Sequence, residues 1–188
     1  MNQIESPPIP GLHQEQEISW DRIFSDWCVR ETGEDWGWES VWQEHGFDNW
    51  ADWRMTYVER FGLLDRAWNL YHIEQPLDFV PNMYVGAYKG WQQYGPDGQG
   101  KVRFAELQHI EDNLKVMKIL QNFPKQTTMI GIKFGETYCV FEGTHRAAAI
   151  ALAVRQGQSI DTKIQIALTE FRSGEQVLFD ANCLRRAN

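Results

Sequence analysis

Residues 129–157, MIGIKFGETYCVFEGTHRAAAIALAVRQG, constrain the fold more than any other part of the chain. Two apolar runs, 129–134 and 138–141, flank a turn at Gly135 and predict a β-hairpin. Gly143 ends the second run, and the Ala-rich residues that follow are strong helix formers. Any fold of this chain must therefore accommodate a hairpin that leads directly into a helix.

The start of this helix has the features of an anion site. His145 and Arg146 fall in its first turn, where backbone N–H groups lack acceptors and the helix dipole is positive. A guanidinium adds bidentate recognition of a phosphate or carboxylate. An arginine is unfavourable at this end of the dipole and needs a compensating partner. The residues alone leave two alternatives, a bound anion or a surface salt bridge.

Glu142, Gly143, Thr144, His145 and Arg146, read with the hairpin before them and the Ala-rich helix after them, resemble the core of the ParB/sulfiredoxin-like superfamily. This superfamily includes ParB partition proteins, sulfiredoxins and a free-serine kinase, and the resemblance covers residues of about 71–171. It implies an α+β fold in which a small mixed sheet carries helices. It also implies that Gly143, Thr144, His145 and Arg146 bind the phosphates of a nucleotide.

Departures from the family pattern narrow the chemistry that the resemblance implies. Sulfiredoxins have a catalytic cysteine where this chain has Thr144, and Cys139 belongs to the preceding strand, so sulfinic acid repair is not expected. ParB proteins have a more Arg-rich motif and continue into a helix-turn-helix region, whereas only a short tail follows here. The acidic residue before glycine is more similar to kinase-type members. Glu142 is accordingly a candidate to hold a metal, to orient a hydroxyl or to cap the helix.

Three classes of function are compatible with this motif. The first is a nucleotide-dependent phosphotransferase or hydrolase, with Glu142, Glu74 and His145 as candidate catalytic residues. Its expected ligand is ATP, ADP or CTP, and any Mg²⁺ would be held mainly by the phosphates. The second is a nucleotide-sensing or protein-interaction module without turnover. The third, a DNA-associated ParB-like protein or nuclease, is least favoured. The histidines and cysteines show no metal-ligand spacing, so we predict no preassembled metal site.

The segment 82–102 is predicted to be a long irregular loop, and such loops are often functional. Lys89 is placed to reach a phosphate. Four aromatic residues of this loop either stack on a base or pin the loop to the body of the protein: Tyr84, Tyr88, Trp91 and Tyr94.

The remaining pattern completes an α+β domain. A strand is expected within 71–80, where Pro76 favours an edge or a bend. Apolar residues at helical spacing predict a helix over 110–120 that ends before Pro124, and alternation predicts a half-buried strand over 164–168.

Eight of the nine tryptophans precede this domain: Trp20, Trp27, Trp36, Trp38, Trp42, Trp50, Trp53 and Trp68. Apolar residues at helical spacing predict one helix between Ser19 and Gly33, a second between Asp48 and Gly62, and a third segment over 64–71. Such stripes are more typical of a core than of a carbohydrate platform or an aromatic cage, with Trp36 the best exception. A protein partner that docks on this Trp-rich region is the alternative.

We divide the chain into a flexible N-terminus (1–16), an acidic Trp-rich helical region (17–70) and a ParB/sulfiredoxin-like domain (71–188). Residues 1–70 carry 5 basic and 14 acidic residues, and residues 71–188 carry 13 and 12. This balance, without a strong basic patch, disfavours DNA binding. The sequence shows neither a signal peptide nor a membrane span, and its three cysteines form no Cys-x-x-Cys pair, so we expect a cytoplasmic protein.

Overall fold

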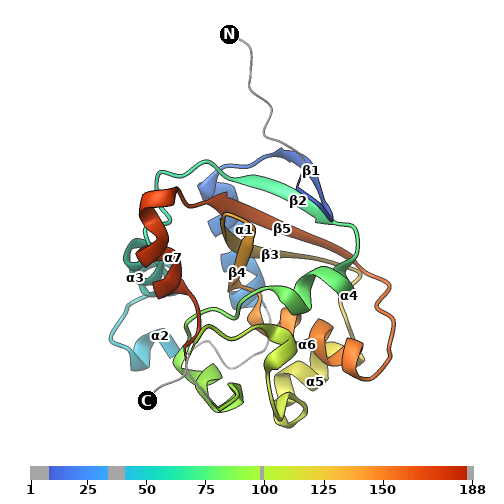
Figure 1. Cartoon of the computed structure of the whole chain (residues 1–188). Helices are drawn as coiled ribbons and strands as arrows, with labels where there is room; N and C mark the ends of the chain where they lie inside the picture. Colours follow the sequence, from blue (N-terminus) through green and yellow to red (C-terminus); the bar gives the residue numbers. More distant parts are fainter. Residues whose placement is uncertain (1–8, 34–40, 98–99, 186–188) are drawn as a thin grey trace.

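The computed structural model describes residues 9–33, 41–97 and 100–185, which form an α+β fold around one five-stranded mixed sheet (Figure 1). The strand order is β1-β2-β5-β3-β4. Strands β3 and β5 are parallel, and the other neighbours are antiparallel. The strands are β1 (Leu12–Glu17), β2 (Asn69–Ile73), β3 (Gln126–Phe134), β4 (Thr137–Glu142) and β5 (Lys163–Glu170).

The predicted hairpin and helix are confirmed. Strands β3 and β4 pair around a turn in which Gly135 has a φ of 56°, a left-handed conformation that glycine adopts without steric cost. A single residue, Gly143, separates β4 from helix α6 (Thr144–Arg155). Gly143 is the N-cap of the helix and has a φ of 95°. The helix then returns the chain to β5, which lies beside β3. The short link between β4 and α6 places the start of the helix at the end of β4.

Helices cover both faces of the sheet, and each face has its own apolar core. On one face, α6 and α5 (Leu114–Gln121) pack against alternate strand residues such as Ile166. On the other face, α1 (Trp20–Gly33), α3 (Trp50–Arg60) and α7 (Gln176–Asn182) pack against residues such as Ala167. The period-2 alternation of the strands therefore divides the core into two clusters.

The Trp-rich region is part of the second core. Trp27, Trp50, Trp53 and Trp68 are buried there together with Phe141 of β4. The core interpretation of the aromatic stripes is confirmed for these tryptophans, whereas Trp36 lies outside the described residues. A partner that docks on this region would have to contact other side chains. No helix in the described ranges is both long and apolar enough to cross a membrane.

Several predicted boundaries differ from the structure. Residues 12–16, expected to be flexible, lie in β1, an edge strand held by its pairing with β2, while residues 1–8 are outside the described part. The helical segment expected over 64–71 is wrong, because β2 occupies its second half and crosses the proposed division at residue 70. This strand joins β1 to β5, so the two regions share one sheet.

Proline and asparagine residues explain other differences. Pro76 starts the short helix α4 (Pro76–Phe79) instead of continuing a strand, because proline fits the first turn of a helix. The side chain of Asn113 accepts hydrogen bonds from the backbone N–H groups of Lys115 and Val116, so α5 begins later than predicted. Asn49, one residue after the expected Asp48, caps α3. The predicted strand over 164–168 is confirmed as β5, but it is buried on both faces rather than half-buried, because each face of the sheet is covered by its own apolar core.

The long segment after α4 is largely irregular, as predicted, and includes short 3-10 turns. The remaining helical elements are α2 (Val41–Glu44), η1 (Val80–Asn82), η2 (Lys89–Tyr94), η3 (Phe104–Glu106), η4 (Ile110–Asp112) and η5 (Ser173–Glu175).

Candidate functional site

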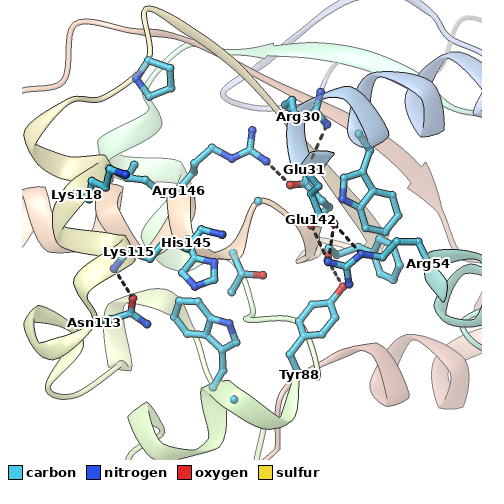
Figure 2. A pocket seen from close by; sticks show the side chains of 18 of the residues that line it. Arg30, Glu31, Arg54, Tyr88, Asn113, Lys115, Lys118, Glu142, His145 and Arg146 are labelled. Atoms are coloured by element: carbon cyan, nitrogen blue, oxygen red, sulfur yellow. Dashed lines mark hydrogen bonds and ion pairs between the residues drawn. The ribbon is translucent and has the colours of Figure 1, made fainter. Parts of the chain in front are cut away.

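A cavity of about 490 Å³ lies at the N-terminal end of α6 (Figure 2). Its walls come from six parts of the chain: the first turn of α6, the end of β4, α5 with its flanking residues, the last turns of α1, Arg54 of α3, and the loop that contains Tyr88 and Trp91. The volume falls within the range of small-molecule sites. The fold thus brings the Trp-rich region and the hairpin-helix motif to a single pocket.

The first turn of α6 faces this cavity. Gly143, Thr144, His145 and Arg146 all line it. The backbone N–H groups of the first helical turn have no intrahelical acceptor, and no side chain of the described residues caps this helix. The positive end of the α6 dipole is therefore directed at the pocket.

The charges of the described lining residues are mainly positive. Five basic side chains contribute to the wall, against two acidic ones, although the whole chain has a net charge of −8. The basic residues are Arg30, Arg54, Lys115, Lys118 and Arg146, and the acidic residues are Glu31 and Glu142. An anion entering the pocket would meet a local field opposite in sign to that of the protein as a whole.

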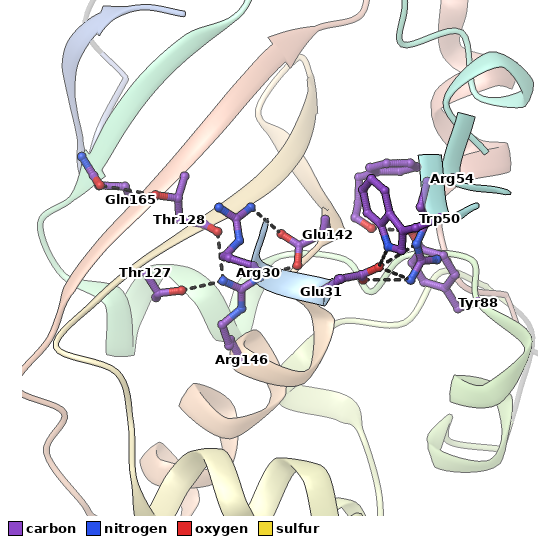
Figure 3. A network of polar contacts seen from close by, with 11 residues as sticks. Arg30, Glu31, Trp50, Arg54, Tyr88, Thr127, Thr128, Glu142, Arg146 and Gln165 are labelled. Atoms are coloured by element: carbon purple, nitrogen blue, oxygen red, sulfur yellow. Dashed lines mark hydrogen bonds and ion pairs between the residues drawn. The ribbon is translucent and has the colours of Figure 1, made fainter. Parts of the chain in front are cut away.

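Arg146 is held inside the protein (Figure 3). Its Nη1 donates to Thr127 Oγ1 at 2.6 Å and to the Thr128 carbonyl at 3.1 Å, and its Nη2 donates to Glu142 Oε1. The other carboxylate oxygen of Glu142 accepts a hydrogen bond from Arg30 Nη2 at 3.3 Å. Arg146 therefore forms a salt bridge, but the pair is largely buried and not on the surface as the alternative had it. Glu142 lies between two guanidinium groups.

A second ion pair forms another part of the wall. Arg54 Nε and Nη2 each donate to an oxygen of Glu31 at 2.8 Å, and Trp50 Nε1 donates to Glu31 Oε2 at 2.7 Å. The Arg54 guanidinium also lies 3.9 Å from the ring centroid of Trp53. Sequence reasoning missed this pair. The available signal was a carboxylate four residues after Trp27, on the apolar face of α1.

His145 is neutral in this setting. Its ring packs edge-on against Trp91, with a centroid separation of 5.0 Å. Burial, together with the positive charges of Lys115 and Arg146, lowers the pKa of His145 to about 3. At neutral pH the imidazole can donate one hydrogen bond and accept another without adding charge to the pocket.

The low pKa of His145 predicts that the free energy of unfolding depends on pH. Between about pH 6.5 and pH 3 the unfolded chain binds a proton at this residue that the folded chain does not. Proton binding favours the unfolded state, so the free energy of unfolding is highest above this window and decreases as pH falls through it. From pH 7 to pH 5, we expect the wild-type protein to lose about 2 kcal/mol more than His145→Gln. Urea unfolding of both proteins at the two pH values measures the difference. Equal losses would contradict this assignment.

Other predicted site residues do not reach the cavity wall. Glu74 is exposed just after β2, and Lys89 is exposed in the loop; neither lines the pocket.

Two aromatic residues of the loop, Tyr88 and Trp91, both pin the loop and line the cavity. The Tyr88 hydroxyl donates to the Phe141 carbonyl, and Trp91 is buried. The two roles proposed for the loop aromatics are therefore compatible in these residues.

The pocket gains residues that we did not predict as site residues. Arg30 and Trp27 come from α1, and Lys115 and Lys118 come from α5, where their departure from the apolar stripe was the available signal.

No family model, curated protein or solved structure matches the chain. Among the described residues, no three His, Cys, Asp or Glu side chains gather as a metal site.

Proposed function

We propose that this protein binds a nucleotide, or another small phosphorylated ligand, in the pocket at the start of α6. The observation that carries the proposal is the combination of five basic side chains with the N-terminal end of α6 around one cavity in an acidic chain. Phosphates are bound well by helix N-termini and by guanidinium and ammonium groups. The resemblance to the ParB/sulfiredoxin-like superfamily supports the same assignment.

In this proposal the motif residues have unequal roles. The backbone N–H groups of Thr144 and His145 would bind phosphate oxygens, with Lys115 and Lys118 of α5 as further charged groups of the wall. Trp91 offers an aromatic wall for a base or another planar group. Arg146 would act mainly by fixing the elbow between β4 and α6 (residues 142–146), because its guanidinium already has protein partners.

The pairing of both pocket carboxylates favours binding without turnover. Glu31 and Glu142 are each engaged by arginine, so their oxygens are committed to the protein. A Mg²⁺ ion would then depend on phosphate oxygens and water for its ligands, which is common for this metal. We therefore favour a nucleotide-sensing module over a phosphotransferase or hydrolase.

Ligand-induced thermal stabilisation tests the binding proposal. We expect at least one of ATP, ADP, CTP and GTP, with or without Mg²⁺, to raise the unfolding midpoint, because a ligand at a hundred times its dissociation constant adds about 2.7 kcal/mol. Lys118→Ala should reduce this shift. Lys125→Ala is the matched control, since Lys125 is exposed and lies outside the pocket wall.

Two outcomes would redirect the proposal. If no nucleotide, inorganic phosphate or pyrophosphate shifts the wild-type midpoint, a phosphate site is excluded. Release of inorganic phosphate or formation of a phosphorylated acceptor by the wild-type protein, reduced in His145→Gln, would favour the enzyme over the sensor. A salt-sensitive complex with duplex DNA would instead revive the DNA-associated function.

A further inference from the structure

One side of the pocket holds two hydrogen-bond donors that the protein leaves unused. The indole Nε1 of Trp27 and the Nε of Arg30 are buried and have no hydrogen-bond partner among the described residues. Both residues line the cavity, and they lie three positions apart on α1, hence on the same side of that helix. Trp27 is only 1% exposed, so bulk water does not solvate its N–H group. Buried donors of this kind are normally satisfied, which points to an acceptor that the protein itself does not supply.

The charge around Arg30 is also incomplete. Arg30 and Arg146 share the single carboxylate of Glu142, so this cluster has one more positive than negative charge. Glu142 contacts Arg30 through Nη2, which leaves Nε directed elsewhere. An uncompensated charge in a partly buried cluster is unfavourable, and a bound anion would balance it.

These donors lie near the elbow but on a different wall. Arg30 and the elbow residue Arg146 contact opposite oxygens of Glu142, so only one carboxylate separates their contacting guanidinium nitrogens (Figure 3). A small ligand could therefore place one anionic group at the first turn of α6 and a second, a few atoms away, against α1.

We propose that the pocket recognises a ligand with two anionic groups, the first held at the start of α6 and the second held by Arg30 and the indole N–H of Trp27. This inference rests on the proposed phosphate site and specifies its ligand class. The shared chemistry is that of a diphosphate or a phosphorylated carboxylic acid. The Trp-rich region thereby supplies part of the binding site in addition to part of the core.

Calorimetric titration with three small probes tests the second subsite. Orthophosphate represents one group, pyrophosphate represents two phosphates, and phosphoglycolate represents a phosphate with a carboxylate. We expect at least one two-group probe to bind wild-type protein about tenfold more tightly than orthophosphate, the effect of an added charge-assisted hydrogen bond. The tighter of the two identifies the second group.

The preference must depend on α1. In Arg30→Gln, the ratio of the affinity for the two-group probe to the affinity for orthophosphate should fall to about one. The orthophosphate affinity itself should change less than about threefold, since the elbow is retained. Trp27→Phe, which keeps an aromatic ring but removes the N–H, should weaken the two-group probe selectively. Arg22→Gln is the control for charge, because Arg22 is on the same helix, is largely exposed and does not line the cavity.

The outcomes separate this inference from the function on which it rests. Binding of all three probes with similar affinity, or an equal loss for all three in Arg30→Gln, would overturn the second subsite and leave the phosphate site intact. Failure of every probe to bind the wild-type protein would overturn the second subsite, and it would overturn the phosphate site as well if no nucleotide shifts the unfolding midpoint. Arg30→Gln should fold because Glu142 keeps its contact with Arg146; if it does not, Arg30→Lys and Trp27→Phe decide the question.

Discussion

Substitution of Glu31 by glutamine is expected to lower the free energy of unfolding by about 3 to 5 kcal/mol, because it removes the negative charge that pairs with a buried guanidinium. Arg54 is only 6% exposed, and its hydrogen bonds to both oxygens of Glu31 fix it beside Trp53. The glutamine amide can replace one acceptor oxygen, but its N–H₂ group would face the donors of Arg54 or Trp50. Urea denaturation at pH 7 measures the loss.

The matched control is the surface pair of the same helix. Arg22 and Asp26 form an i,i+4 salt bridge with side chains 71% and 43% exposed, so Asp26→Asn should change stability by less than about 1 kcal/mol. A comparable effect of the two substitutions would show that the Glu31–Arg54 pair is not buried as described. An Arg54→Met/Glu31→Leu double variant, which removes both charges, should be more stable than Glu31→Gln, because no charge is left unpaired.

This pair also explains why α1 could be predicted as a helix but not as a wall of the pocket. Ser19, the apolar spacing and Gly33 are local signals, and they specify the helix correctly. The partner of Glu31 lies 23 residues away on another helix, and that of Arg30 lies 112 residues away on β4. Contacts across such separations depend on how the elements pack, which periodicity alone does not determine.

The elbow shows the same distinction. The hairpin, Gly143 and the helix start follow from local preferences, so their positions were predictable. A salt bridge of Arg146 was one of two alternatives that the residues left open, but its partner Glu142 was not predicted. The contacts of Arg146 with Thr127 and Thr128 require the register of β3. Glu74 illustrates the opposite case, a candidate chosen from strand position alone that the fold leaves outside the pocket wall.

Boundary errors arose where a local signal competed with sheet formation. Residues 12–16 are mostly polar, and their strand conformation comes from pairing with β2 rather than from an apolar pattern. The segment over 64–71 has apolar residues at helical spacing, yet β2 is buried between two neighbouring strands. In both cases the backbone hydrogen bonds of the sheet override weak propensity.

Gly143→Ala is expected to disrupt both the fold of the elbow and its ligand binding. A φ of 95° is strained for any residue with a Cβ, at a cost of about 1 to 3 kcal/mol. The added Cβ would also lie 2.7 Å from Met129 Cγ and 3.2 Å from Arg146 Nη2, and such overpacking costs about 1 to 3 kcal/mol more. Thermal unfolding and the nucleotide-induced shift of the midpoint measure the two effects.

Gly135→Ala separates strain from crowding. Gly135 also has a positive φ, 56°, but a Cβ there would meet no described atom within 4 Å, so we expect a loss of only about 1 to 2 kcal/mol and unchanged binding. If Gly143→Ala behaves like Gly135→Ala in both measurements, the close approach of Gly143 to Met129 and Arg146 does not control the site. The alternative outcome is that Gly143→Ala abolishes the ligand-induced shift. The new methyl group would contact Met129 of β3 and also Arg146, the arginine that fixes Glu142. Loss of the shift would therefore show that the pocket binds an anion only while the elbow backbone and the Arg146 guanidinium are held together.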